Sequence, residues 1–288
     1  MRINSINNIG IVGMGVMGVG VAQTLAQTGL QIIALDEADE ICAQARANIT
    51  KNLRLYNLFS KNKSSEDIET VLSHITFTTD FTDLAKVDYL IENATEQWQV
   101  KQEIYSLLDK ICPANVIFAV NTSTIPVNRI ANLTKRPTKV IGAHFMNPVP
   151  LRNMVEVIRG PQTSSQTIRV TLDLLSKMDK QGIVVNDSPG FVINRILMPT
   201  INDAIRLVEE GIATVENIDK LFKGCLGHPM GPLETADLIG LDTILYSLES
   251  LYKCYNNKEY KPCMLLAKKV NQNELGNKTG RGFYKHSS

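Results

Sequence analysis

The clearest pattern in the chain is a pair of short apolar runs near the N-terminus, with glycines and one longer segment between them. Residues 9–12 and 31–35 have the length and composition of buried parallel strands. Residues 16–27 have the small and apolar spacing of a helix packed on a sheet, and Gly29 is placed to end that helix. The pattern predicts a strand, a glycine turn, a helix and a second strand.

Short apolar runs alternating with helical segments continue along the first two thirds of the chain. Strands alternating with helices build a parallel sheet that is covered by helices, so we predict an α/β fold with a Rossmann-type doubly wound parallel sheet. The expected strands are residues 88–93, 116–120, 140–145, 154–158 and 181–185, and the expected helices are 38–58, 97–111 and a short one that begins at Pro126.

The character of the chain changes after the turn signal Asp187-Ser188-Pro189-Gly190. From there on the pattern is helical throughout. We therefore divide the chain into an α/β domain, residues 1–187, and an all-helical C-terminal domain, residues 188–288. The expected helices are residues 191–210, 214–226 with Thr214 as the cap, 234–239, 243–255 and 263–270, followed by a glycine-rich tail at 276–284.

The glycine turn has the spacing G-x-G-x-x-G, which is typical of dinucleotide-binding sites. Gly13 permits the tight turn, Gly15 lets the backbone approach a pyrophosphate, and Gly18 lets the helix pack closely on the strand. The helix N-terminus adds unpaired N–H groups and the positive end of a dipole. We expect Gly13, Gly15, Met17 and Gly18 to contact a cofactor.

An acidic residue ends the second strand, about where the acid that holds the adenosine ribose is expected, ~20 residues after the glycines. This residue is Asp36, and Glu37 follows it with no arginine beside them. Two carboxylates would repel a 2′-phosphate. The sequence therefore predicts NAD rather than NADP as the cofactor.

Composition narrows the class of protein further. With 288 residues the chain is long enough for two cores, and a net charge of +1 gives no reason to expect nucleic acid as a partner. Its five cysteines are far apart, and no histidine lies at metal-ligand spacing, so we expect reduced thiols, no metal and a cytoplasmic protein. We expect no signal peptide, because the first eight residues are mostly polar, and we find no apolar run of the ~20 residues that span a bilayer.

A cluster of basic residues lies on and after the helix expected at residues 38–58. Lys51 and Arg54 are three residues apart and share a face, with Arg46 and Lys61 nearby. Such a cluster is usually a solvated helix face. It also suits an anionic substrate handle, either the phosphates of coenzyme A or the acidic surface of a carrier protein.

Polar residues at strand ends are the candidates for chemistry, because parallel sheets bind ligands there. His144 ends one strand and can act as a general base near neutral pH. Glu156 can hold its imidazole if their strands are neighbours, while Ser123 and Asn194 can hold a substrate oxygen. A single histidine at a strand end is more often structural, so position alone leaves both interpretations open. We assign no role to the other histidines.

Several long motifs, in order and over essentially the whole length, resemble the short-chain 3-hydroxyacyl-CoA dehydrogenases, especially the bacterial 3-hydroxybutyryl-CoA dehydrogenases. The matching segments are GMGVMGVGVA (13–22), NTSTIP (121–126), GAHFMNPVP (142–150), MVEVI (154–158), DSPGFVINRILMP (187–199), HPMGPLETADLIGLDT (228–243) and NKTGRGFY (277–284). The resemblance implies reversible, NAD-dependent oxidation of a 3-hydroxyacyl thioester.

The same resemblance implies a role for individual residues. It makes His144 the catalytic histidine, Glu156 its partner, and Ser123 and Asn194 the residues that contact the substrate. It places Asp36 on the adenosine ribose and implies a homodimer through the C-terminal domain, with the active site in the cleft between domains. The implied contacts on the nicotinamide side are Glu96, Lys101, Ser123, Asn147 and Lys278.

The chain departs from the family pattern at a few positions near these motifs. The departures are Met146 for a phenylalanine, Thr124 for a serine, Arg152-Asn153 for Met-Lys, and Asn93 for a small residue. One alternative is therefore the same chemistry on a hydroxyacyl group bound to an acyl carrier protein, as in polyketide extender-unit biosynthesis.

Two further alternatives would place the protein in a different functional class. One is a catalytically silent relative that binds NAD. The joint presence of the four candidate catalytic residues argues against it. The other is a hydroxyacid dehydrogenase with a lysine base, which would need a lysine beside Asn194, where Ile193 and Arg195 stand.

Overall fold

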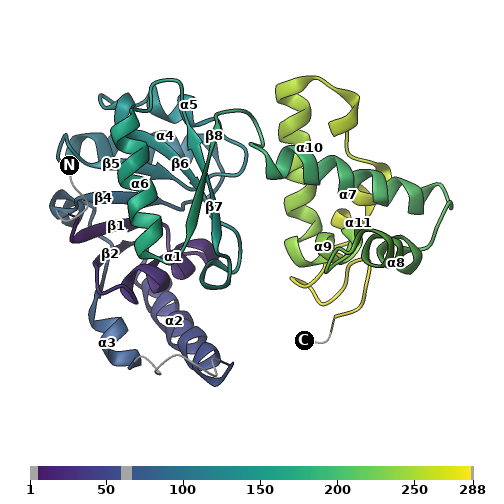
Figure 1. Cartoon of the computed structure of the whole chain (residues 1–288), viewed down its shortest axis with the longest axis horizontal. Coiled ribbons are helices and arrows are strands. Elements are labelled where there is room, and N and C mark those ends of the chain that lie inside the picture. Colours follow the sequence, from purple (N-terminus) through teal and green to yellow (C-terminus); the bar gives the residue numbers. More distant parts are fainter. Residues whose placement is uncertain (1–5, 60–66, 287–288) are drawn as a thin grey trace. The chain divides into compact units, whose positions relative to one another are not determined.

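The structure, a computed structural model, describes residues 6–59 and 67–286. The chain forms two compact units, residues 1–188 and residues 189–288 (Figure 1). Within the described residues, no helix is both long enough and apolar enough to cross a membrane.

The first unit is built on one eight-stranded sheet in the order β3-β2-β1-β4-β5-β6-β7-β8. The order reverses direction at β1, as in doubly wound folds. Its central strands are buried on both faces, which explains their continuous apolar runs. The strands are β1 (Asn8–Val12), β2 (Gln31–Leu35), β3 (Ile75–Thr78), β4 (Tyr89–Glu92), β5 (Ile117–Val120), β6 (Val140–His144), β7 (Met154–Arg159) and β8 (Gln181–Asn186).

The predicted doubly wound parallel sheet is confirmed, except that one pair of strands, β6 and β7, is antiparallel. These two strands are joined by nine residues, 145–153, which contain only the short 3-10 helix η4 (Val149–Leu151). A parallel crossover needs about a dozen residues or more, so the chain can only turn back. This hairpin-like return sets His144 directly opposite Glu156 in the register.

Helices cover the sheet, and one of them, α6, runs along the face turned toward the viewer in Figure 1. Apolar side chains from β1, β2 and α1, such as Ile9, Ile11, Leu25 and Ile32, meet in one core. The pattern of apolar and polar residues does not predict α3, β3 or α6. The helices are α1 (Val16–Ala26), α2 (Asp39–Phe59), α3 (Ile68–Ser73), α4 (Trp98–Ile111), α5 (Val127–Ala131) and α6 (Ser165–Lys177), with 3-10 helices η2 (Phe81–Lys86) and η3 (Pro137–Lys139).

The second unit is helical, as predicted, and its helices enclose a separate apolar core that includes Ile201, Leu233 and Leu248. Thr214 caps α8 as expected, because its side chain accepts a hydrogen bond from Asn217 N. The helix α7 begins two residues later than predicted. The helices are α7 (Ile193–Glu209), α8 (Val215–Leu226), α9 (Pro232–Ile239), α10 (Leu241–Tyr255), η5 (Lys258–Tyr260) and α11 (Met264–Asn271).

Candidate active site

A histidine, a glutamate and a serine meet: His144 ends β6, Glu156 lies within β7, and Ser123 follows β5. His144 Nδ1 lies 2.8 Å from Glu156 Oε2, across the β6–β7 pair. His144 Nε2 lies 3.1 Å from the hydroxyl of Ser123, which follows β5. His144 and Glu156 are buried, and Ser123 is half-buried. An imidazole held between a carboxylate and a hydroxyl has the geometry of a proton-transfer site.

The loop that carries Ser123 is fastened by one carboxylate. Glu96 Oε1 accepts hydrogen bonds from the Thr122 hydroxyl at 2.6 Å, from Ser123 N at 3.0 Å and from Thr124 N at 2.8 Å. Ile125 N adds a weaker contact at 3.3 Å. Because successive backbone N–H groups converge on one oxygen, the loop has one defined shape, and Ser123 is presented at a defined position.

The glycine turn is shaped for close packing on one side and open space on the other. A Cβ atom at Gly18 would collide with the carbonyl oxygen of Gly13, and Gly13 itself has φ +88°. A Cβ at Gly15 would meet no protein atom within 4 Å. The first turn of α1 therefore stays accessible, with no side chain capping its N–H groups.

A cavity of about 550 Å³ lies beside this turn, lined among others by Gly13, Gly15, Asp36, Phe81 and Asn93. It joins the open side of the glycine turn to the carboxyl ends of β1, β2 and β4, where ligands of doubly wound sheets bind. Its position and lining fit a dinucleotide such as NAD.

Asp36, expected on the adenosine ribose, also holds the turn itself. Its Oδ2 accepts a hydrogen bond from Met14 N at 2.5 Å, and its Oδ1 accepts one from Glu37 N at 2.7 Å. The carboxylate thus ties the end of β2 to the glycine turn after β1. Met17 packs against the core as a partly buried side chain, so its cofactor contact stays a prediction.

Lys101, another expected cofactor contact, pairs with a buried carboxylate, and its contact with the cofactor stays a prediction. Its side chain is fully buried, and Nζ lies 2.7 and 2.8 Å from the two oxygens of Glu92, which is also fully buried. Nζ also lies 3.4 Å from Ala94 O, and Glu92 Oε1 accepts from Ala94 N at 2.7 Å. The pair therefore fastens a residue of the cavity wall. The sequence pointed to Lys101 but assigned nothing to Glu92, whose place at the end of an apolar strand was the available signal.

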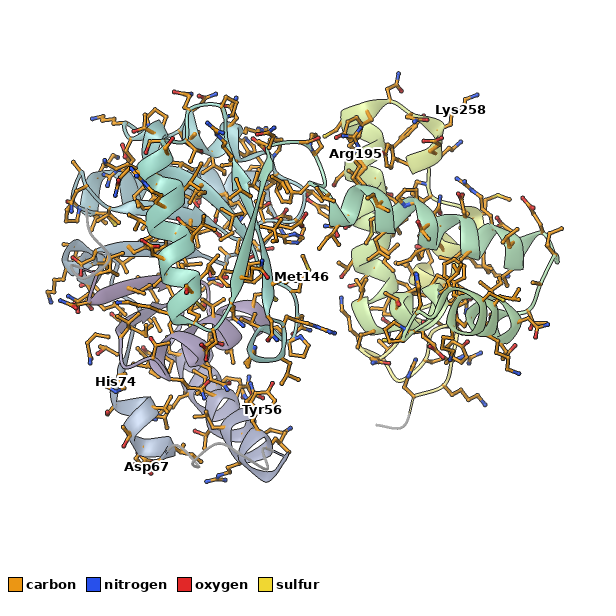
Figure 2. All side chains as sticks on the ribbon, viewed as in Figure 1. Tyr56, Asp67, His74, Met146, Arg195 and Lys258 are labelled. Carbon is orange, nitrogen blue, oxygen red and sulfur yellow. The ribbon has the colours of Figure 1, made fainter. Side chains whose placement is uncertain are left out.

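The remaining expected residues are distributed over both units. In the first unit, Asn147 is exposed on the loop after β6, next to Met146, which Figure 2 labels. Lys51 and Arg54 are exposed on α2, whereas Lys61 lies outside the described residues. Lys51 and Arg54 thus form an exposed basic surface on α2, as expected.

In the second unit, Asn194 lies in the first turn of α7. Its neighbour Arg195, labelled in Figure 2, places its guanidinium 4.7 Å from the ring centre of Tyr255. Lys278 makes hydrogen bonds of 2.8 and 3.0 Å to the carboxylate of Asp242 and one of 2.9 Å to the Thr243 hydroxyl. The roles of Asn194 and Lys278 toward substrate and cofactor stay predictions.

Known proteins match nearly the whole chain. The model of the 3-hydroxyacyl-CoA dehydrogenase NAD binding domain matches residues 8–188, and that of the C-terminal domain of the same enzymes matches residues 190–286. A probable 3-hydroxybutyryl-CoA dehydrogenase of Deinococcus radiodurans is 44% identical over 277 residues, which cover 96% of this chain and 99% of that protein.

Two further relatives extend the match to solved structures and to animals. The crystal structure of (S)-3-hydroxybutyryl-CoA dehydrogenase from Ralstonia eutropha has a TM-score of 0.92 and 42% identity, covering 99% of this chain and 100% of that one. The mitochondrial hydroxyacyl-coenzyme A dehydrogenase of Homo sapiens is 37% identical over 287 residues, covering 98% of this chain and 91% of that protein.

The Rossmann-type sheet, its glycine turn and these matches define an NAD-dependent oxidoreductase. Within that class, the chain belongs to the 3-hydroxyacyl-CoA dehydrogenase family. The resemblance inferred from the sequence motifs is thereby confirmed, and so is NAD as the cofactor.

Proposed function

We propose that this enzyme interconverts a short-chain 3-hydroxyacyl-CoA and the corresponding 3-ketoacyl-CoA, with His144 as the general base and acid. The observation that supports this most strongly is the placement of the imidazole between the Glu156 carboxylate, at 2.8 Å, and the Ser123 hydroxyl, at 3.1 Å. The relatives named as 3-hydroxybutyryl-CoA dehydrogenases support the substrate class.

The bond to Glu156 sets the direction of proton transfer. A carboxylate accepts a hydrogen bond, so Nδ1 carries the proton and Nε2 is left as the basic atom on the side of Ser123. Nε2 takes the proton of the substrate hydroxyl during oxidation and returns it during reduction. The negative charge of Glu156 stabilises the imidazolium that forms in between.

The hydride goes to a different acceptor from the proton. Held beside the glycine turn, NAD would supply the acceptor for the hydride from C3 of the substrate, so the products of oxidation would be the ketoacyl thioester, NADH and one proton. Ser123 donates to the substrate oxygen and keeps it aligned with Nε2. Asn194 is proposed to contact the same oxygen. It belongs to residues 188–288, which we propose to be the domain that binds the substrate and forms a homodimer.

The group that carries the acyl thioester, either coenzyme A or a carrier protein, is a separate part of the proposal. Lys51 and Arg54 give α2 an exposed basic face that suits the phosphates of coenzyme A. The same face suits an acidic carrier protein. An assay of one acetoacetyl group on coenzyme A and on a carrier protein decides between them, and Lys51→Glu with Arg54→Glu should raise KM for the true substrate with little change in kcat.

The test of the catalytic assignment is replacement of His144. His144→Gln keeps a hydrogen-bonding side chain opposite Glu156 but cannot take up a proton. We expect the rate of NADH oxidation with acetoacetyl-CoA to fall about 10²- to 10⁴-fold, the usual contribution of general acid–base catalysis. NADH binding, followed by fluorescence titration, should stay within about twofold of the wild type. Wild-type turnover in this variant would refute His144 as the base.

A further inference from the structure

A row of side-chain hydrogen bonds runs across the ends of three neighbouring strands. Asn121 Nδ2 donates to Asn93 Oδ1 at 2.8 Å, and Phe145 N donates to Asn121 Oδ1 at 3.2 Å. Asn93, Asn121 and Phe145 are each the first residue after their strands, β4, β5 and β6. The row therefore lies just beyond the last backbone pairings of the sheet.

Each end of this row reaches a functional part of the unit. Asn93 lines the cavity beside the glycine turn, and its backbone N donates to Val12 O at 2.7 Å, next to Gly13. At the other end, Phe145 directly follows His144 in the chain. In between, Asn121 lies two residues before Ser123. The row thus connects the wall of the cofactor cavity to the residues that hold the proton-transfer pair.

The sheet does not need this row for its own pairing. Asn121 N already donates to Glu92 O at 2.9 Å, and β5 and β6 pair through their backbones. The Asn93 amide is also held in one orientation, because its Nδ2 donates to Ile91 O at 3.3 Å and its Oδ1 is thereby turned to accept. The bond between the two amides fixes the Asn121 side chain, which in turn receives the backbone N–H beside His144.

We propose that Asn93 is a positioning residue of the reaction: through Asn121 it keeps the Ser123 hydroxyl and the His144 imidazole aligned relative to the cofactor cavity. This rests on the proposed catalytic function of His144. Small displacements of reacting groups are costly, since a shift of about 1 Å can lower a rate about 10²-fold. A neutral hydrogen bond between amides should account for a smaller part of that range.

Steady-state kinetics with acetoacetyl-CoA and NADH test the proposal. Asn93→Ala should lower kcat about 3- to 30-fold, more than a weak neutral hydrogen bond contributes but less than the roughly 10²-fold loss from a full 1 Å misalignment. KM for acetoacetyl-CoA should stay within about twofold. Asn93→Asp keeps an acceptor for Asn121 Nδ2, so it should recover most of kcat, whereas its charge in the cavity wall should raise KM for NADH.

A double-mutant comparison separates positioning from general damage. In an Asn121→Ala background, Asn93→Ala should change kcat less than about twofold, because the connection is already broken. The deuterium isotope effect with NADH doubly deuterated at C4 should be at least as large as in the wild type. The matched control is Gln162→Ala, which removes an exposed amide–amide bond of 3.0 Å to Asn132 in the same unit and should leave kcat unchanged.

Three results would overturn the proposal. The first is unchanged kcat in Asn93→Ala, and the second is an equal loss from that substitution in both backgrounds. The third is a smaller isotope effect, which would put the loss in another step. If the alanine variant does not fold, Asn93→Ser supports the same comparison. Failure of the proposed function is distinguishable, because it would appear as wild-type turnover in His144→Gln, whatever the Asn93 variants do.

Discussion

Each unit of this protein contains a histidine paired with a buried carboxylate at the same distance, but the two pairs have different surroundings. In the first unit, His144 Nδ1 lies 2.8 Å from Glu156, and its other nitrogen meets the Ser123 hydroxyl. In the second unit, His286 Nε2 lies 2.8 Å from Asp237 Oδ2. Asp237 is fully buried, and the His286 side chain is 27% exposed.

The bonds around the carboxylates explain why only the first pair is a candidate for catalysis. The two oxygens of Asp237 also accept from the backbone N–H groups of Phe283 and Tyr284, at 2.9 and 2.8 Å. Asp237 therefore fastens the C-terminal tail to α9. Glu156 instead faces the imidazole across two paired strands. A histidine–carboxylate distance alone therefore does not identify a catalytic pair. The other contacts of the two side chains must be considered as well.

The largest expected effect on folding comes from the pair in the second unit. Asp237→Ala leaves two part-buried backbone N–H groups, those of Phe283 and Tyr284, without their acceptor and frees the tail from α9. We expect a loss of about 3–5 kcal/mol in the free energy of unfolding, the usual result of breaking a buried charged network. Urea denaturation followed by circular dichroism measures it, and kcat per folded molecule should stay close to the wild type.

His286→Ala is the control for this variant. It removes only a partly exposed partner and leaves the backbone bonds to Asp237 in place, so the cost should be about 1 kcal/mol or less. A loss equal to that of Asp237→Ala would mean that the histidine, rather than the two N–H groups, holds the tail.

The corresponding change in the first unit should affect turnover instead of folding. Glu156→Gln keeps an acceptor for Nδ1–H but removes the charge that stabilises the imidazolium. We expect kcat to fall roughly 10- to 100-fold, less than on loss of the imidazole, because the base itself remains. The free energy of unfolding should change by less than about 1.5 kcal/mol, since a neutral side chain replaces a buried charge. Unchanged kcat would make this pair structural, like the one in the second unit.

The smallest expected effect concerns the acid stability of the second unit. The hydrogen bond from Lys223 to Glu234, together with Gly231 N, holds the pKa of the Glu234 carboxyl below its usual range. A carboxyl whose pKa is lowered on folding stabilises the folded state above its unfolded pKa of about 4.3 and loses that contribution as the pH falls through its lower folded pKa.

Glu234→Gln should remove this dependence. We expect the variant to be less stable than the wild type at pH 7 by under about 1 kcal/mol, because the pair is open to solvent, and the difference should shrink as the pH is lowered to 3. Thermal unfolding at both pH values measures the difference, and the rate of NADH oxidation at pH 7 should be unaffected. A constant difference between pH 7 and pH 3 would assign the effect to packing instead of charge.

Local patterns in the sequence were enough to predict much of the fold. The glycine spacing, the apolar strands and the helical C-terminal third follow from contacts between near neighbours and from burial on both faces of a sheet. The segments that form α3, β3 and α6 were missed. Residues 75–78 form a strand of only four residues at the edge of the sheet, where pairing with β2 rather than local pattern decides the conformation.

The sequence by itself determined the family, the cofactor and the candidate residues His144, Glu156 and Ser123, because these depend on residue types in long, ordered motifs. Only the tertiary structure decided how these residues are brought together. The short β6–β7 connection forces the antiparallel turn that sets Glu156 opposite His144. Burial pairs Lys101 with Glu92, and three separate strand ends bring Asn93, Asn121 and Phe145 into one row. Such contacts join residues far apart in the chain, so no local pattern records them.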